Sequence, residues 1–242
     1  MTNNLVYQYW LGPGSRDYWT LRSLESAQSY AGRTDADYIF NTNPTLKGLD
    51  RSNKDHYYFG ILDLIYDTKY DSYDDILYLD CDIVIHPKAA NIFQLPEMED
   101  CVDLAASMQI VHLEDYWEMY NVFKKVGAFF KNAYTSGVPY KHFNTGVILF
   151  TKKGRLRARE EWDVNWLDWL EINKDEDKIL ILDQPYINAM VNKHSFKLLE
   201  LGTEWNHVPD LTLPNLHKAH FYHLHTSFGD DHARFFQRFR LE

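Results

Sequence analysis

The sequence predicts an α/β protein built on a mixed, mostly parallel β-sheet flanked by helices. Apolar segments typical of strands alternate with amphipathic segments typical of helices along the chain, which is the pattern of such sheets. The chain has 242 residues, of which 45% are hydrophobic and 16% aromatic, enough to bury a substantial core. No internal repeat or low-complexity linker interrupts it, so we expect residues 1–242 to form a single domain.

The first part of the chain alternates strands with helices. Gly12 and Gly14 flank Pro13 and end the first strand, and Asp17 can cap the helix that follows. The next helix is predicted from apolar residues at helical spacing between 55 and 66. The predicted elements are strands at 5–10, 37–40 and 76–79 and helices at 17–32 and 55–66.

The second part continues the same pattern after a short apolar segment at 102–108. The helix predicted at 156–172 carries Trp162, Trp166 and Trp169 at positions i, i+4 and i+7, a spacing that favours a core stripe over a ligand-binding platform. The remaining predicted elements are strands at 147–150 and 220–226 and helices at 115–132, at 183–191 and at the C-terminus.

Charge and cysteine content narrow the classes of partner. The net charge of −10 argues against a nucleic-acid or anionic-membrane surface, so a bound phosphate would need a local cation. Two cysteines supply neither a disulfide framework nor a zinc cluster, which indicates a reducing compartment. The N-terminus lacks a signal sequence, and no stretch approaches the roughly 18 apolar residues of a membrane span. We therefore expect a cytoplasmic protein without a transmembrane segment, which can still be one domain of a longer chain.

Two acids, Asp80 and Asp82, interrupt an apolar run in the stretch YDDILYLDCDIVIHP at 73–87. On a strand, residues i and i+2 point to the same side, so both carboxylates can face one point. Such a pair suits Mg²⁺ or Mn²⁺, which keep open positions for substrate phosphates. The alternative is that the two acids end the strand and are solvated.

The acid-pair segment resembles the Asp-x-Asp segment of GT-A glycosyltransferases, particularly glycosyltransferase family 8, which includes glycogenin and bacterial galactosyltransferases. Three further segments follow in the order that this family uses, and they spread the resemblance over nearly the whole chain. These are HFNTGVILF at 142–150, LDQPYIN at 182–188 and FYHLHTS at 221–227. The resemblance implies a GT-A, Rossmann-like fold.

The resemblance also implies a metal site. Asp80 would bind the nucleotide ribose and the metal, and Asp82 would ligate Mn²⁺, or Mg²⁺, together with a histidine on a late strand. That histidine is His223 or His225, with His223 favoured. The chain departs from the family pattern after this point, because Thr226 replaces a glycine and Gly229 stands where the family places a phosphate-binding lysine.

Further roles follow from the same resemblance. Asn144 and Gly146 would line the sugar pocket, Asp183 would hold sugar hydroxyls, and Gln184 would lie under the anomeric carbon, although Pro185 replaces the next acid of the family segment. The alternatives are an Asn-Thr-Gly turn for the first pair and a helix N-cap for Asp183. Tyr9 and Trp10 lie where the family holds the nucleotide base, with a core role as the alternative.

The predicted activity is metal-dependent transfer of a sugar from a nucleoside-diphosphate sugar, UDP-hexose in the favoured case, to a glycan or other hydroxyl acceptor. The resemblance favours retention of anomeric configuration; an inverting enzyme would need a carboxylate base, for which Asp183 is available. Two alternatives remain. One is a haloacid-dehalogenase-type phosphatase with Asp80 as nucleophile and Asp82 as general acid/base, and the other is a non-catalytic domain that binds sugar nucleotides.

Overall fold

A computed structural model of the chain describes residues 2–12, 18–98, 102–108, 142–174, 182–207 and 219–224. The strands are β1 (Asn4–Tyr9), β2 (Asp37–Asn41), β3 (Asp75–Leu79), β4 (Ile83–Ile85), β5 (Leu104–Met108), β6 (Phe143–Thr151), β7 (Leu198–Leu201) and β8 (Phe221–His223). The α-helices are α1 (Tyr18–Arg33), α2 (Asp63–Tyr66), α4 (Lys152–Glu161), α5 (Trp166–Asn173) and α6 (Asp183–Lys193). Short 3-10 helices are η1 (Lys54–Leu62), η2 (Thr68–Tyr70), η3 (Ile92–Gln94) and η5 (Thr203–Trp205).

Six strands form the main sheet in the order β2-β1-β3-β6-β5-β7. β1 is parallel to β2 and β3, and β5 is parallel to β7, whereas β6 is antiparallel to both of its neighbours. The prediction of a mixed, mostly parallel sheet is therefore confirmed. The antiparallel β6 has a consequence for the site, because its first residues lie at the same edge of the sheet as the carboxyl ends of β1 and β3.

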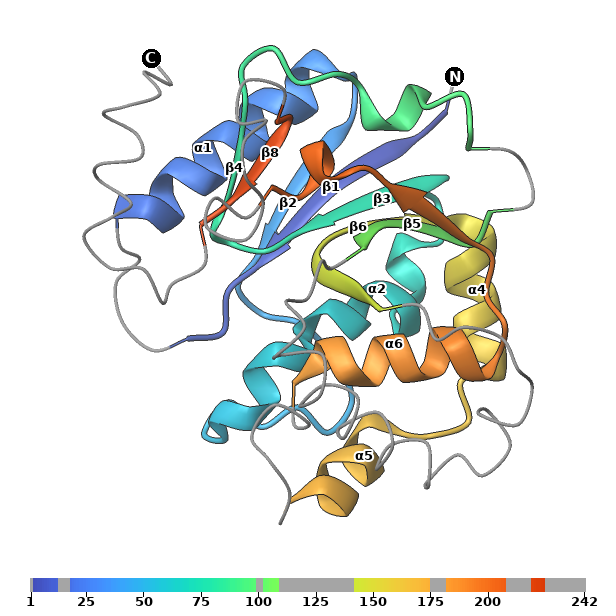
Figure 1. The fold of residues 1–242 in the computed structure, drawn as a ribbon. Helices are drawn as coiled ribbons and strands as arrows, with labels where there is room; N and C mark the ends of the chain where they lie inside the picture. The colour runs from blue at the N-terminus through green and yellow to red at the C-terminus, as the bar shows by residue number, and fades with distance from the viewer. Residues whose placement is uncertain are drawn as a thin grey trace, which may run out of the picture.

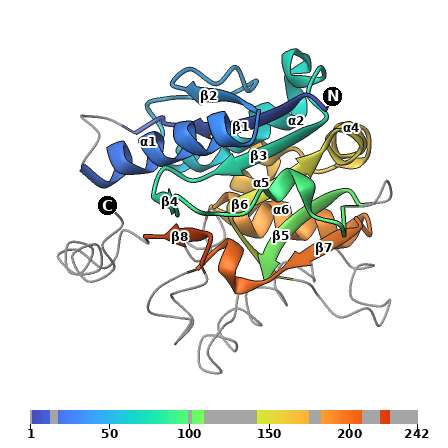
Figure 2. The same ribbon diagram turned by 90° about the horizontal axis from the view of Figure 1, so that it is seen from above.

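The main sheet is covered on both faces, as Figures 1 and 2 show. Side chains that alternate along the strands enter two separate cores. Ile76 lies in the core on the face covered by α2, α4 and α6, and Leu77 lies in the core on the face covered by α1. Both faces are apolar because both are buried, which explains the near-continuous apolar runs in the sequence. The small β4-β8 sheet lies on the α1 side.

Most predicted elements are confirmed. The strands at 5–10, 37–40 and 76–79 and the helices at 17–32 and 183–191 correspond to β1, β2, β3, α1 and α6 within two residues at each end. The apolar segment at 102–108 contains β5, the strand at 147–150 lies within the longer β6, and the strand at 220–226 contains β8. The predicted helices at 115–132 and at the C-terminus lie outside the described residues.

The single helix predicted at 156–172 is wrong, because two helices occupy this stretch. The chain leaves helical geometry at Trp162, and Asn165 starts α5 by accepting a hydrogen bond from the backbone N–H of Leu167 over 2.8 Å. The core role of the tryptophans is nevertheless confirmed, since Trp162, Trp166 and Trp169 are 7%, 2% and 2% exposed and share one core cluster.

Three shorter elements differ from the prediction. The helix predicted at 55–66 is a 3-10 helix as far as Leu62 and α-helical only in α2. The strands β4 and β7 were not predicted, and β4 matters most because it begins directly after the acid pair and pairs with β8 rather than with the main sheet.

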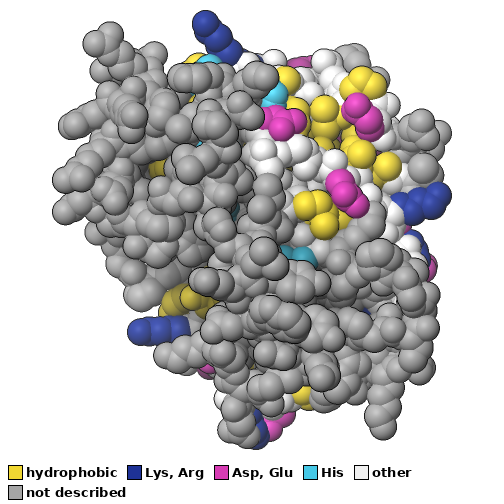
Figure 3. All heavy atoms as spheres, in the orientation of Figure 1, with side chains coloured by type: hydrophobic (Ala, Val, Ile, Leu, Met, Phe, Trp, Pro, Cys, Tyr) yellow, Lys and Arg dark blue, Asp and Glu magenta, His cyan; other side chains and the backbone are white. Residues whose placement is uncertain are grey.

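The surface of the described part agrees with the acidic composition. Its Lys and Arg side chains gather into no broad patch on the face shown in Figure 3. Among the described residues, no helix is long and apolar enough to cross a membrane.

Candidate active site

The acid pair lies in a turn rather than on a strand. β3 ends at Leu79, the backbone N–H of Asp80 donates to the Gly146 carbonyl over 2.8 Å, and the N–H of Ile83 turns back to the Asp80 carbonyl over 3.2 Å. The Gln8 side-chain amide donates to the same carbonyl over 3.0 Å. Strand alternation is therefore the wrong reason for the two carboxylates to face one point; the turn between β3 and β4 brings them together.

β8 carries His223 to this turn. It pairs antiparallel with β4, His223 lies opposite Ile83, and the backbone N–H of Leu224 donates to the Asp82 carbonyl over 2.9 Å. The Nε2 atom of His223 is 3.4 Å from an oxygen of Asp82. Among the described residues, Asp80, Asp82 and His223 form a group whose ligand atoms all lie within 4.8 Å of one another. His225, the alternative ligand in the sequence, lies outside the described residues, as do Thr226 and Gly229.

Electrostatics at this group favour a bound cation. Burial and the neighbouring Asp82 carboxylate raise the pKa of Asp80 to about 6. Burial alone would lower the pKa of His223, but the carboxylates of Asp82 and Asp80 outweigh it and raise that pKa. Each shift follows from negative charges crowded in a buried place, where a divalent cation would relieve the repulsion. Two carboxylates and an imidazole also suit Mn²⁺, so the residues fit the metal that the resemblance implies.

Asn144 and Gly146 lie at the start of β6, beside the acid pair. The Asn144 side-chain oxygen accepts hydrogen bonds from the Gly146 backbone N–H and from the Asn206 side-chain amide, each over 2.8 Å. That oxygen is therefore engaged within the protein, and among the described residues the Asn144 NH₂ group has no hydrogen-bond acceptor. Gly146 packs directly against His223, since a Cβ at this position would lie 2.6 Å from the imidazole Cε1.

Asp183 and Gln184 begin α6 and face the same edge of the sheet. Burial and the negative charge of Asp80 raise the pKa of Asp183 to about 7. The Gln184 side-chain oxygen accepts from the Thr145 backbone N–H over 3.1 Å, and its nitrogen lies 3.2 Å from Nε2 of His142. Because the Thr145 N–H fixes which end of the amide is oxygen, the His142 Nε2 must accept, and that imidazole is neutral. Burial agrees with this, as it lowers the pKa of His142 to about 3.

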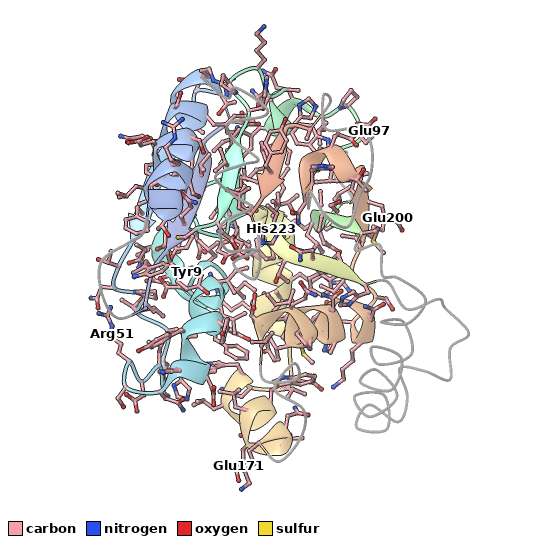
Figure 4. All side chains as sticks on the ribbon, turned by 60° about the vertical axis from the view of Figure 1, so that its left-hand side comes forward. Tyr9, Arg51, Glu97, Glu171, Glu200 and His223 are labelled. Carbon is pink, nitrogen blue, oxygen red and sulfur yellow. The ribbon has the colours of Figure 1, made fainter. Side chains whose placement is uncertain are left out.

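The aromatic residues at the end of β1, Tyr9 and Trp10, have different surroundings. The Tyr9 ring stacks on Tyr78 at a centroid distance of 5.9 Å, and its hydroxyl donates to the Tyr58 carbonyl over 2.8 Å. Tyr78 in turn donates a short hydrogen bond to the Asp80 carboxylate. Trp10 is partly buried and its ring lies against Gly12. In the view of Figure 4, Tyr9 and His223 lie near the middle of the described part, while Glu171 on α5 lies at its lower end.

Three residues of this site were not singled out from the sequence. Tyr78 holds the Asp80 carboxylate, His142 holds the Gln184 amide, and Asn206 lies 3.1 Å from Nδ1 of His223 through its side-chain oxygen. Tyr78 and His142 lie within the segments that carry the family resemblance, so their place in the sequence was a signal that they are near the site. Asn206 stands in none of these segments, and its contact depends on tertiary structure.

Comparisons with known proteins agree with this architecture. Residues 32–228 match the model of glycosyl transferase family 8. No curated protein sequence matches the chain significantly. A glycosyltransferase involved in glycosylation of the major capsid of PBCV-1 aligns with a TM-score of 0.60 at 12% identity, covering 99% of this chain and 100% of that one.

Two further solved structures have the same fold. The galactosyltransferase LgtC, in complex with donor and acceptor sugar analogs, aligns with a TM-score of 0.51 at 15% identity, covering 91% of this chain and 86% of that one. Mouse xyloside xylosyltransferase 1 aligns with a TM-score of 0.50 at 13% identity, covering 93% and 98%. The fold is thus the GT-A fold, and because the family model spans most of the sequence, this chain belongs to glycosyl transferase family 8 and is a glycosyltransferase.

Proposed function

We propose that this glycosyltransferase moves a hexose from a nucleoside-diphosphate sugar, UDP-hexose in the favoured case, to a hydroxyl of a glycan or another acceptor. One observation carries the proposal: Asp80, Asp82 and His223 converge at the edge of the sheet where Asn144 and Asp183 also lie. This edge holds the carboxyl ends of parallel strands, where ligands bind in open α/β sheets. In the proposal, residues 1–242 act as one catalytic domain.

Asp80, Asp82 and His223 would hold Mn²⁺ or Mg²⁺ in this proposal. The metal would supply Lewis-acid and charge stabilisation for the departing diphosphate. The chain needs such help, because its net charge is −10 and no lysine stands six residues after His223. Tyr78 would support the arrangement by donating a hydrogen bond to one oxygen of the Asp80 carboxylate.

Donor binding is assigned to residues around the metal group. Asp80 would contact the nucleotide ribose, and Tyr9 and Trp10 would lie beside the base. Asn144 would donate through its NH₂ group to a sugar hydroxyl, and Gly146 would allow the sugar a close approach to the backbone. Asp183 would hold further hydroxyls; with a pKa of about 7, its carboxyl group can accept or donate a hydrogen bond near neutral pH.

Asp183 and Gln184 are the proposed catalytic residues. The Gln184 oxygen, which accepts from the Thr145 N–H, carries partial negative charge and would stabilise positive charge that develops at the anomeric carbon. The favoured course is retention: the acceptor hydroxyl attacks from the side of the leaving group, and a diphosphate oxygen takes its proton. The alternative is inversion, with Asp183 as the base, which its pKa of about 7 would suit.

The other partners follow from composition and remain predictions. The acidic composition argues against nucleic acid as a partner. The low cysteine content favours a reducing, cytoplasmic compartment. Family membership favours transfer over the phosphatase alternative, while a domain that binds sugar nucleotides without turnover is an outcome of the experiment below.

The test is a panel of UDP- and GDP-sugars with Mn²⁺ and candidate acceptors. We expect metal-dependent release of the nucleoside diphosphate, and the anomeric configuration of the product distinguishes retention from inversion. Asp82→Ala should abolish Mn²⁺-dependent donor binding. Asp163→Asn, which changes a carboxylate paired with Lys193 away from the site, is the matched control. Binding without turnover would support the scaffold alternative, and release of phosphate from phosphomonoesters would support the phosphatase.

A further inference from the structure

Two side chains, those of Asn144 and Asn206, link a backbone amide of β6 to the imidazole of His223. The Gly146 N–H donates to the Asn144 oxygen over 2.8 Å, and that oxygen also lies 2.8 Å from the Asn206 nitrogen. The Asn206 oxygen lies 3.1 Å from Nδ1 of His223. On its other side, Nε2 of the same imidazole lies 3.4 Å from Asp82.

The direction of every hydrogen bond in this series follows from the first one, which the Gly146 N–H donates. A backbone N–H can only donate, so the Asn144 atom facing Gly146 is the oxygen. That oxygen can only accept, so the Asn206 atom facing it is the nitrogen. The other Asn206 atom is therefore the oxygen, which needs a donor. Nδ1 of His223 must then carry a proton.

We propose that Asn206 is a positioning residue that, together with Asn144, keeps the His223 proton on Nδ1 and presents the Nε2 lone pair to the metal held with Asp80 and Asp82. This inference rests on the metal site of the proposed function. It names the ligand atom, and it assigns a role to a residue outside the segments that form the site. The hydrogen bond from Nδ1–H to Asn206 can form in both the neutral and the charged imidazole, whereas Nε2 has a lone pair for the metal only in the neutral form, so a bound metal takes the place of the second proton.

Packing holds Asn206 and His223 in register. Asn206 is 5% exposed and His223 is 4% exposed. The N–H of His207 donates to the Phe221 carbonyl and the N–H of His223 donates to the His207 carbonyl, each over 2.9 Å, so two backbone bonds tie the segments together. Because the pair is buried, an imidazole without a proton on Nδ1 would leave the Asn206 oxygen buried without a donor from His223, which is costly.

The test measures the tautomer and the metal separately. Two-bond ¹H–¹⁵N correlation spectra of metal-free, ¹⁵N-histidine-labelled protein report which nitrogen of His223 carries the proton, with the signal assigned by its loss in His223→Gln. Calorimetry with Mn²⁺ alone gives the metal affinity. The variants are Asn206→Ala and Asn206→Asp, with Asn206→Leu as a second deletion that preserves volume. Asn173→Ala is the matched control, because Asn173 is 7% exposed and donates one buried hydrogen bond to Trp169 within α5.

At a pH where the His223 imidazole is neutral, we expect its proton on Nδ1 in the wild type and in Asn206→Asp, which retains the accepting oxygen. Asn206→Ala and Asn206→Leu should lose this preference and bind Mn²⁺ about 10- to 100-fold more weakly, the usual effect of removing a partner of a metal-bound histidine. Asn206→Asp should bind within about threefold of wild type or more tightly, and Asn173→Ala should match wild type.

Each contrary result has a distinct meaning. A neutral His223 imidazole with its proton on Nε2 alone, in a wild-type protein that binds Mn²⁺, would overturn the role of Asn206 but leave the metal site. Wild-type affinity in Asn206→Ala, or Asn206→Asp as weak as Asn206→Ala, would reduce Asn206 to a packing residue. A wild type with Nδ1–H that does not bind Mn²⁺ would remove the metal site itself, and with it the positioning role.

Discussion

Replacing Gly146 with alanine should damage the metal site while leaving the fold intact. A Cβ at this position would lie 2.6 Å from Cε1 and 2.9 Å from Nδ1 of His223. Carbon atoms in contact prefer about 3.5–4.0 Å, so the imidazole must retreat by about 1 Å. Metal–ligand distances tolerate only about 0.2 Å, so a shift of this size should weaken Mn²⁺ binding by about 10- to 100-fold. Overpacking should also cost about 1–3 kcal/mol of stability.

Isothermal titration with Mn²⁺ and urea unfolding of Gly146→Ala give both quantities. Gly32→Ala is the matched control, because Gly32 lies in α1 and a Cβ there would meet nothing within 4 Å. This control should gain about 0.5–1 kcal/mol of stability and keep its Mn²⁺ affinity. If Gly146→Ala folds and binds Mn²⁺ within twofold of wild type, His223 does not ligate the metal from the position described.

Two further predictions concern residues that support the site, and a third concerns the packing of the fold. His142 has a pKa of about 3 in the folded protein and about 6.5 when unfolded, so the unfolded chain takes up a proton first as pH falls. The free energy of unfolding of the wild type should therefore fall by about 2 kcal/mol between pH 7 and pH 5. Urea unfolding at each pH should show no such loss in His142→Gln. Gly60→Ala would place a Cβ 2.5 Å from the Tyr9 ring and should weaken UDP binding more than Mn²⁺ binding in calorimetry; equal losses would contradict a base-side role for Tyr9. Gly154→Ala would place a Cβ 1.9 Å from the Asp103 carbonyl oxygen and should cost about 3 kcal/mol or more in unfolding free energy; a cost below about 1 kcal/mol would contradict the close contact between α4 and the Asp103 backbone.

The elements that the sequence predicted well are those whose pattern is local and strong. β1 and β3 are apolar runs buried on both faces, and the amphipathic α1 ends near a glycine, so pattern and structure agree. Where the pattern crosses a break, it fails: the three tryptophans keep helical spacing over two helices, because Trp162 lies just after the end of α4 and faces the same core as the two on α5. The strands β4 and β7 are too short to carry a pattern, and their pairing partners are distant in sequence.

The candidate site shows the same division. The acid pair, Asn144, Gly146, Asp183 and Gln184 could all be named from sequence, because their segments occur in a recognisable order. The reason for the convergence of Asp80 and Asp82 could not, since it depends on where the chain turns out of β3 towards β8. Sequence could not choose between His223 and His225 by pattern either; among the described residues, His223 lies beside Asp82.

The order of residues alone was enough to predict the α/β class, the order of most elements and the family, because apolar periodicity and short motifs are properties of neighbouring residues. Which atoms meet depends on how distant segments pack. The antiparallel β6 brings Asn144 and Gly146 to the carboxyl edge of β3, and a bridge between residues 206–207 and 221–223 places Asn206 against His223. Hydrogen-bond direction then passes from one backbone N–H through two amides to an imidazole, and such a path exists only once distant segments are packed together.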